Sequence, residues 1–68
     1  MKKKYTNSRM EYLIDEYIHN KRNRKIMKMH FIDGDSVFVI SKDKDVKLTE
    51  RRVSQIIVDC CAELAEYL

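Results

Sequence analysis

Proline and tryptophan are absent from this 68-residue sequence, and glycine occurs only once, at Gly34. Sheet-rich small domains depend on proline and glycine for their many tight turns, so their scarcity argues against such a fold. Charged residues make up 37% of the chain, which favours a few helices joined by short polar links. A chain this short buries only about 60% of its unfolded surface and makes one small core. The sequence therefore predicts an all-α fold with a single domain over residues 1–68.

Long apolar runs and functional cysteine patterns are also missing. No stretch approaches the roughly 20 apolar residues that span a membrane, and the basic start lacks the apolar segment of a signal peptide. We therefore expect a cytoplasmic protein with no membrane partner. Cys60 and Cys61 are adjacent, which suits neither a disulfide nor a zinc site, so we expect no metal and no cofactor. No phosphate-binding glycine loop and no nucleophile–histidine pattern is present, so we expect no enzyme.

The positive charge is concentrated at the start of the chain. Residues 1–28 contain nine Lys or Arg and three acids, whereas residues 59–68 contain three acids and no Lys or Arg. We expect residues 1–7 to form a basic, flexible arm. A basic front end suits a surface that faces phosphates. The alternative is that a small helical protein carries these charges only for solubility.

The first predicted helix covers residues 8–19. Ser8 and Glu11 form the S-x-x-E pattern of a capping box, in which each side chain satisfies a free backbone donor. Apolar residues then recur at the spacing of one helical face. These residues are Met10, Leu13, Ile14, Tyr17 and Ile18.

The second predicted helix covers residues 22–32. Asn20 or Asn23 can cap its first turn, because the amide oxygen accepts a hydrogen bond from a free backbone N–H. Gly34 fits the left-handed C′ position at which helices commonly end.

The third element is open to two readings. Ser36 can cap a short helix over residues 36–43. The segment VFVI is rich in β-branched residues, so residues 31–40 could instead form a β-hairpin across Asp33 and Gly34. We favour the helix, because an isolated two-stranded hairpin is marginally stable and no third strand is available.

The last predicted helix covers residues 49–67 and is capped by Thr49. Leu48 and Val53 have the spacing of a hydrophobic staple, which fixes how a chain enters a helix. A short helix, a polar turn and a longer helix in this order predict a tetrahelical helix-turn-helix domain. Residues 49–58 would be its recognition helix. Its candidate base-contacting residues, of types able to read the major groove, are Arg51, Arg52, Ser54 and Gln55.

Several segments resemble the fourth conserved region of bacterial RNA polymerase sigma factors, and small sigma-like proteins of phages and prophages of Gram-positive bacteria. The matching segments are IDEYI at 14–18, R-x-R-x-I-M at 22–27, FIDG at 31–34, T-x-R-x-V at 49–53 and I-I at 56–57. Two features depart from the family. VFVIS replaces its acidic short helix, and the turn that follows is longer.

The resemblance implies a sequence-specific DNA-binding regulator of transcription, with double-stranded DNA as its partner and RNA polymerase as a further candidate partner. It implies that residues 49–55 carry the base contacts. Residues expected to hold the DNA backbone are Thr49, Arg22, Arg24, Lys25 and Lys28. The alternative is a helical adaptor that docks on RNA polymerase or a phage protein and has no DNA affinity of its own.

The second half of the last helix is apolar around most of its circumference. A helix of this kind is normally buried on more than one face, and a core this small cannot cover both. We therefore expect a homodimer, which would also suit a palindromic operator. The expected interface consists of Val58, Cys61, Ala62, Ala65 and Leu68.

Overall fold

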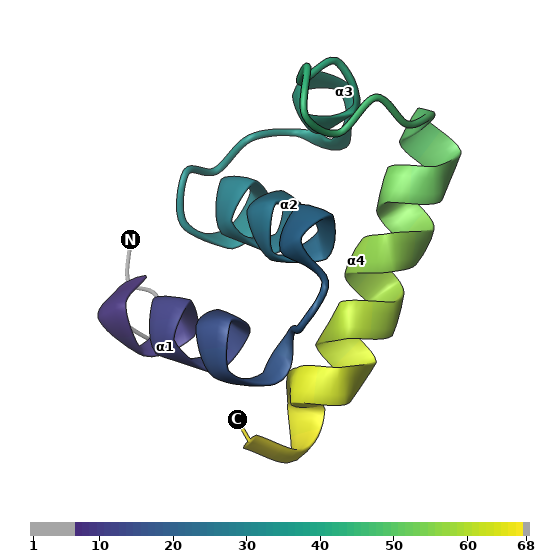
Figure 1. Ribbon diagram of the computed structural model, residues 1–68. Helices are drawn as coiled ribbons and strands as arrows, with labels where there is room; N and C mark the ends of the chain where they lie inside the picture. Colours follow the sequence, from purple (N-terminus) through teal and green to yellow (C-terminus); the bar gives the residue numbers. More distant parts are fainter. Residues whose placement is uncertain (1–6, 68) are drawn as a thin grey trace.

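The computed structural model describes residues 7–67 and contains four α-helices followed by a short 3₁₀ turn (Figure 1). The described residues contain no strand, so the predicted all-α fold is confirmed and the hairpin reading of residues 31–40 is wrong. The arm predicted at residues 1–7 lies almost wholly outside the described residues. The elements are α1 (Asn7–Tyr17), α2 (Lys21–Phe31), α3 (Val37–Ser41), α4 (Glu50–Leu64) and η1 (Ala65–Tyr67).

Helix α4 organises the arrangement of the other three. It is the longest helix and contacts α1, α2 and α3. Figure 1 shows α3 beside the N-terminal end of α4, α2 beside its middle and α1 beside its C-terminal end. Because α1, α2 and α3 all pack against one side of α4, the opposite side of α4 faces solvent along its whole length.

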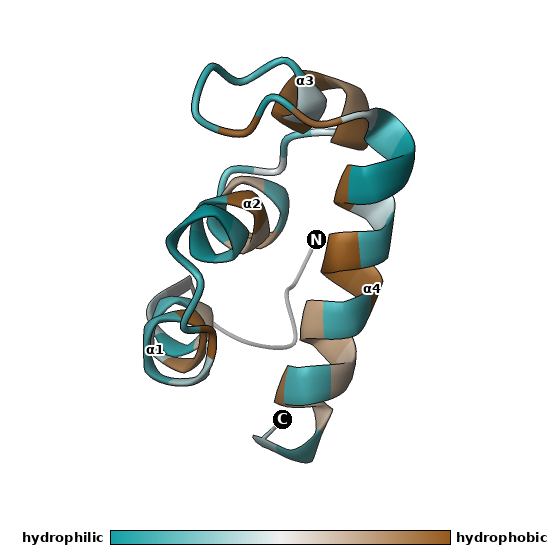
Figure 2. Cartoon of the chain, turned by 45° about the vertical axis from the view of Figure 1, so that its right-hand side comes forward, coloured by the Kyte–Doolittle hydropathy of each residue, from teal (hydrophilic) through white to brown (hydrophobic). Residues whose placement is uncertain are grey.

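The core is formed where the apolar faces of all four helices meet. Figure 2 shows the hydrophobic positions of α4 turned toward α1 and α2. Each fully buried aliphatic side chain contributes about 1.5–3 kcal/mol, so this set is the main source of stability. The most deeply buried side chains are Leu13, Ile14, Ile26, Met27, Ile40, Val53 and Leu64.

Three of the predicted helix caps are confirmed. The Asn20 amide oxygen accepts from the Asn23 N–H at 3.0 Å, which resolves the choice between the two asparagines. The Ser36 hydroxyl accepts from the Val39 N–H at 3.2 Å, and the Thr49 hydroxyl accepts from the Arg52 N–H at 3.1 Å. Each cap satisfies a backbone donor that the first helical turn leaves without a partner.

Helix α1 differs from its predicted bounds at both ends. It begins at Asn7, so Ser8 lies inside the first turn and the predicted capping box with Glu11 is wrong. It ends at Tyr17 because Asn20 must adopt an extended backbone, with φ −77° and ψ 123°, to cap α2. The ring of Tyr67 in η1 stacks on Tyr17, with centroids 3.7 Å apart, and so joins the end of the chain to α1.

The link from α2 to α3 turns at Gly34. Its φ is +79°, the left-handed conformation that glycine adopts without the strain of a Cβ atom. The C-cap of α2 is Ile32, so Asp33 occupies the C′ position. Gly34 was predicted at C′ but lies one position later, at C″. The Asp33 N–H donates to the Lys28 carbonyl at 3.1 Å, which uses one of the free carbonyls at the helix end.

The connection over residues 42–49 is ordered by its own hydrogen bonds, and it shortens α3 relative to the predicted 36–43. The Asp43 carboxylate accepts from the Asp45 N–H at 2.8 Å, and the Asp43 carbonyl accepts from the N–H groups of Val46 and Lys47, each at 3.0 Å. Val46 is buried, and Lys47 has a φ of 48°. This connection is about twice as long as the 3–4 residues of an ordinary helix-turn-helix.

No helix among residues 7–67 is both long enough and apolar enough to cross a membrane.

Candidate nucleic-acid interface

The N-terminal half of α4 presents the predicted base-contacting side chains to solvent. Val53 and Ile56 of this half are buried, and they fix which side of the helix faces outward. Arg51 and Gln55 are one turn apart on the side opposite that core, so they lie in one line along the exposed surface. The residues of the predicted set, Arg51, Arg52, Ser54 and Gln55, are all exposed.

Two of the residues at this surface already make intramolecular hydrogen bonds. The Thr49 hydroxyl accepts from the Arg52 N–H, but its own proton stays available to a phosphate oxygen. The Gln55 side-chain amide donates to the Asp59 carboxylate at 3.0 Å. Gln55 would have to release Asp59 before it could pair with adenine through both its donor and its acceptor.

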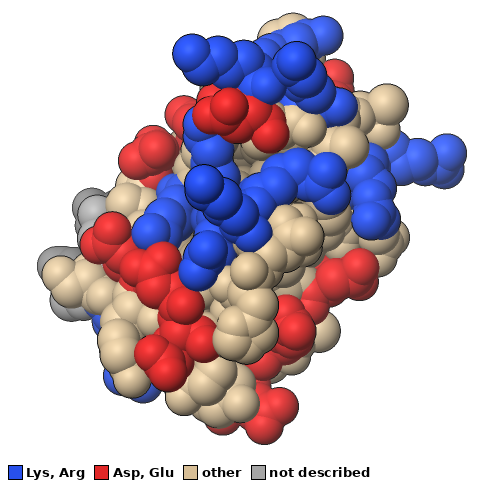
Figure 3. Space-filling view, in the orientation of Figure 1, with Lys and Arg blue, Asp and Glu red and all other residues tan. Residues whose placement is uncertain are grey.

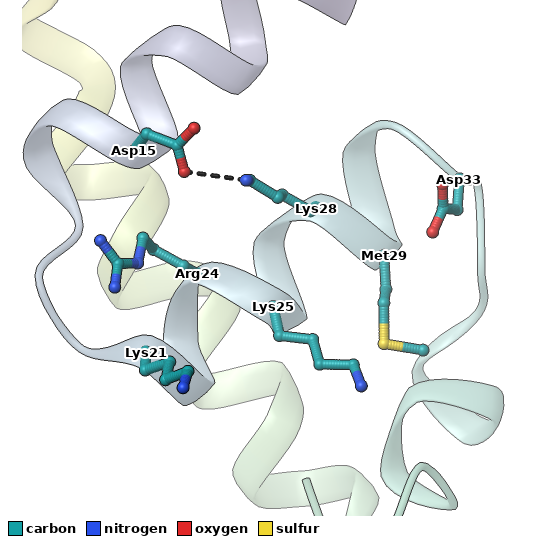
Figure 4. Close-up of a pocket in the computed structure, with 7 residues that line it drawn as sticks. All are labelled: Asp15, Lys21, Arg24, Lys25, Lys28, Met29 and Asp33. Atoms are coloured by element: carbon teal, nitrogen blue, oxygen red, sulfur yellow. Dashed lines mark ion pairs between the residues drawn. The ribbon is translucent and has the colours of Figure 1, made fainter. Parts of the chain in front are cut away.

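The outer side of α2 carries a second group of cations. Lys21 lies three and four positions before Arg24 and Lys25, and these lie four and three positions before Lys28, so all four share one face. Together with neighbouring side chains they surround an open hollow of about 420 Å³ (Figure 4). The complete lining is Asp15, Lys21, Arg24, Lys25, Lys28, Met29 and Asp33.

Lys25 is held by two carboxylates of the connection before α4. Its ammonium nitrogen lies 2.6 Å from the Asp45 carboxylate and 3.1 Å from that of Asp43. Hydrogen bonds to Asp45 and then to Asp43 raise the pKa of Lys25. The Asp45 backbone N–H and the Lys25 ammonium lower the pKa of Asp43. Lys25 therefore joins α2 to the connection, and its charge is already compensated.

Lys28 is also compensated from within the molecule. Its ammonium lies 2.8 Å from the Asp15 carboxylate of α1, as Figure 4 shows, and 3.9 Å from that of Glu11. A phosphate would have to displace these carboxylates to bind Lys28. The expectation that Lys25 and Lys28 hold the DNA backbone stays a prediction, but their carboxylate partners make them less available than Arg22 and Arg24.

Lys21 is a residue that the sequence reasoning missed. It is exposed in the first turn of α2 and lines the same hollow as Arg24. Its spacing of three from Arg24 and four from Lys25 was the signal that could have identified it. Lys21, Arg22 and Arg24 have no carboxylate partner among the described ion pairs, so they form the cationic group with charge left for an external anion.

The two cation groups belong to one face of the molecule. Figure 3 shows Lys and Arg side chains across α2 and around the N-terminal half of α4, with acidic side chains below them and also among the basic ones near α3.

Residues 7–67 include histidine, cysteine and acidic side chains of the types that ligate metals. They contain no group of three or more His, Cys, Asp or Glu side chains close enough to hold a metal ion. Cys60 is buried and Cys61 is half-buried, and both are free thiols. Burial raises the pKa of the Cys60 thiol to about 11, which keeps it protonated and weakly nucleophilic near neutral pH.

The predicted dimer residues lie mostly at the surface of the single chain. The Val58 side chain is 61% exposed, Ala62 and Ala65 are exposed, and Cys61 is half-buried. Leu68 lies outside the described residues. Ala65 begins the 3₁₀ turn η1, so the α-helix that the sequence predicted to residue 67 ends at Leu64.

No protein-family model, no curated protein and no solved structure matches the chain.

Proposed function

We propose that the protein is a sequence-specific DNA-binding regulator of transcription. The exposed N-terminal half of α4 would enter the major groove, and α2 would lie across the sugar–phosphate backbone. The observation that carries the proposal is the exposure of Arg51 and Gln55 on a capped helix that packs against α2, whose outer side is cationic. The sigma-factor resemblance of the sequence supports the same arrangement, and such a protein would act in the cytoplasm without catalysis.

Each residue type has a defined part in this arrangement. Arg51 can donate two hydrogen bonds to guanine, and Gln55 can donate to and accept from adenine. Arg52 and Ser54 flank them on the same exposed surface and can reach neighbouring bases. Lys21, Arg22 and Arg24 would contact phosphates and fix the position of α4 without reading sequence.

The first experiment is selection of bound sequences from random duplex DNA, followed by fluorescence anisotropy on the selected site. We expect Arg51→Ala and Gln55→Ala to reduce discrimination between the selected site and its point variants, each by about 1–3 kcal/mol at one base pair. Glu16→Ala, an exposed change on α1, is the control and should leave discrimination unchanged. Unaltered site preference in both α4 variants would show that another surface reads the DNA.

One observation favours the alternative, a helical adaptor that docks on RNA polymerase or a phage protein. The Phe38 side chain is 55% exposed and that of Val39 is 47% exposed, and such adjacent apolar side chains are typical of a protein contact. Anisotropy at two salt concentrations separates the two functions. A DNA binder loses affinity steeply as salt rises, whereas an adaptor binds little DNA at either concentration.

A further inference from the structure

The first of two unpartnered apolar surfaces lies on α3. Phe38 and Val39 expose about half of their side chains, because the short helix turns Ile40 into the core instead. The Lys42 ammonium lies over the Phe38 ring, 5.2 Å from its centroid. We call Phe38 and Val39 the α3 patch.

The connection that follows the α3 patch is rich in lysine. Lys42, Lys44 and Lys47 are exposed in the connection that follows α3. The two acids of this connection, Asp43 and Asp45, both bind Lys25 of α2 and so add little negative charge at the patch. Figure 3 shows Lys and Arg side chains gathered at the end of the molecule that α3 occupies.

The second apolar surface lies on the C-terminal half of α4. Val58 and Ala62 of α4 are exposed one turn apart on the side opposite the core, and exposed Ala65 follows three positions later at the start of η1. We call these three residues the α4 stripe. Val58 alone exposes 61% of its side chain. The stripe is shallow because two of its three residues are alanines.

The surroundings of the α4 stripe are acidic. Asp59, Glu63 and Glu66 are exposed beside it, and residues 59–67 contain no Lys or Arg. The lower part of the molecule in Figure 3 shows mostly acidic side chains, although others lie among the basic side chains of the upper part. Among residues 7–67, one of these apolar surfaces is thus followed by exposed lysines and the other is flanked by exposed acids.

We infer that the α3 patch of one molecule binds the α4 stripe of a second copy of this chain. Head-to-tail pairing places Lys42, Lys44 and Lys47 against the acids beside the stripe, and it covers both apolar surfaces. The alanines leave room for the Phe38 ring at the centre of the contact. Two identical α4 stripes pairing with each other would instead bring Asp59, Glu63 and Glu66 together with their own copies, and two α3 patches would oppose lysines.

A head-to-tail contact is heterologous, so a dimer leaves one surface free at each end, and further copies add to an open chain or, where the rotation between copies permits, close into a ring. Neighbouring molecules would point the same way, which on DNA corresponds to direct repeats and not to a palindrome. The contact leaves Arg51 and Arg52 uncovered, because it uses only the later turns of α4. The self-association does not depend on DNA binding, and either property can be absent without the other.

Sedimentation equilibrium in low salt, from about 20 μM to 1 mM, tests this contact over the range of weak protein association. The wild-type mass should rise with concentration above the monomer value of 8.2 kDa. Phe38→Asp removes the α3 patch and Val58→Asp removes the α4 stripe, so each variant alone should stay monomeric. An equimolar mixture of the two should form dimers and nothing larger, because each variant keeps the one surface that the other lacks.

Tyr12→Asp is the matched control, since Tyr12 is an equally exposed aromatic residue on α1, and it should associate like the wild type. Dimers in the mixture would also prove that both variants are folded. The inference fails if the wild type stays at 8.2 kDa at every concentration, or if the mixture stays monomeric while the wild type associates. It fails equally if Phe38→Asp alone still dimerises, since that result assigns the contact to two α4 stripes.

Discussion

The salt dependence of DNA binding should distinguish Arg24 from Lys25, although the two residues are adjacent on α2. Arg24 lines the open hollow without a carboxylate partner among the described ion pairs, whereas Lys25 is held between Asp43 and Asp45. We compare Arg24→Met with Lys25→Met. Both changes remove one positive charge and keep an apolar stem, so their general effect on the electrostatic potential is the same. Any difference between them therefore reports a direct contact with phosphate.

The magnitude follows from counterion release. Each phosphate contact adds about −0.9 to the slope of log K against log salt. Contacts from Lys21, Arg22 and Arg24 would give a slope of about −2.7. Loss of the Arg24 contact should reduce it to about −1.8 and weaken binding about eightfold at 0.1 M salt. Lys25→Met should leave the slope near that of the unmodified protein, because Lys25 already has its anions.

Fluorescence anisotropy with one selected duplex, titrated at four or more salt concentrations, supplies these slopes. Circular dichroism at each salt concentration verifies that both variants stay folded. Equal slopes for the two variants, both flatter than that of the unmodified protein, would mean that DNA displaces Asp43 and Asp45 from Lys25. Equal slopes that match the unmodified protein would place the phosphate contacts away from α2 and refute the proposed orientation.

Two further predictions concern stability. Ile26→Val should lower the free energy of unfolding by about 0.5–1.5 kcal/mol in urea titrations, because Ile26 is fully buried. The control Val58→Ala is an exposed change and should alter the free energy of unfolding by less than about 0.5 kcal/mol at micromolar concentration. The pKa of Asp43 is lowered in the folded protein, so its ionised carboxylate stabilises the fold above the ordinary pKa of 3.8, and this contribution should fade as the pH falls below that value. The pKa of Lys25 is raised, so its charged form stabilises the fold below the ordinary pKa of 10.5, and this contribution should fade as the pH rises above that value. Asp43→Asn should reduce the acid sensitivity measured by thermal unfolding between pH 2 and 5, and unchanged sensitivity would contradict this role.

The sequence predicted α1, α2 and α4 because their apolar residues repeat at the period of a helix. Leu13, Ile26 and Ile56 occupy positions of the predicted inward faces, and all three are buried. The three caps that were confirmed depend only on hydrogen bonds within four residues, so local sequence was sufficient. The capping box at Ser8 failed because a competing start one residue earlier, at Asn7, places Ser8 inside the helix.

The exposure of α3 could not be predicted from its sequence. VFVI is apolar at every position, so its pattern gives no preferred face. A helix of one turn can bury only one side, and the hydrogen bonds of the following connection decide which side that is. Ile40 lies inside, while Phe38 and Val39 remain at the surface. The exposure of Phe38 and Val39 therefore depends on tertiary structure and not on the local sequence.

The cationic side of α2 shows the same limit for the candidate site. Sequence spacing places Lys21, Arg24 and Lys25 on one face, but it cannot show which of them have partners elsewhere in the chain. Lys25 and Asp45 are twenty positions apart, and only the fold brings them to 2.6 Å. A count of basic residues therefore overstates the positive charge available to DNA. Some of these residues form ion pairs within the chain and stabilise the fold instead.

The contacts of Asp43 and Asp45 with Lys25 explain why the connection over residues 42–49 is long. An ordinary helix-turn-helix joins its helices with 3–4 residues, which leaves no room for a loop that reaches another element. The longer connection here extends Asp43 and Asp45 to Lys25 and buries Val46 in the core. It fixes α3 and the start of α4 relative to α2 at two independent points. The additional residues therefore supply contacts that a third helix of only five residues cannot make. They also determine the position of Thr49, where the proposed recognition surface begins.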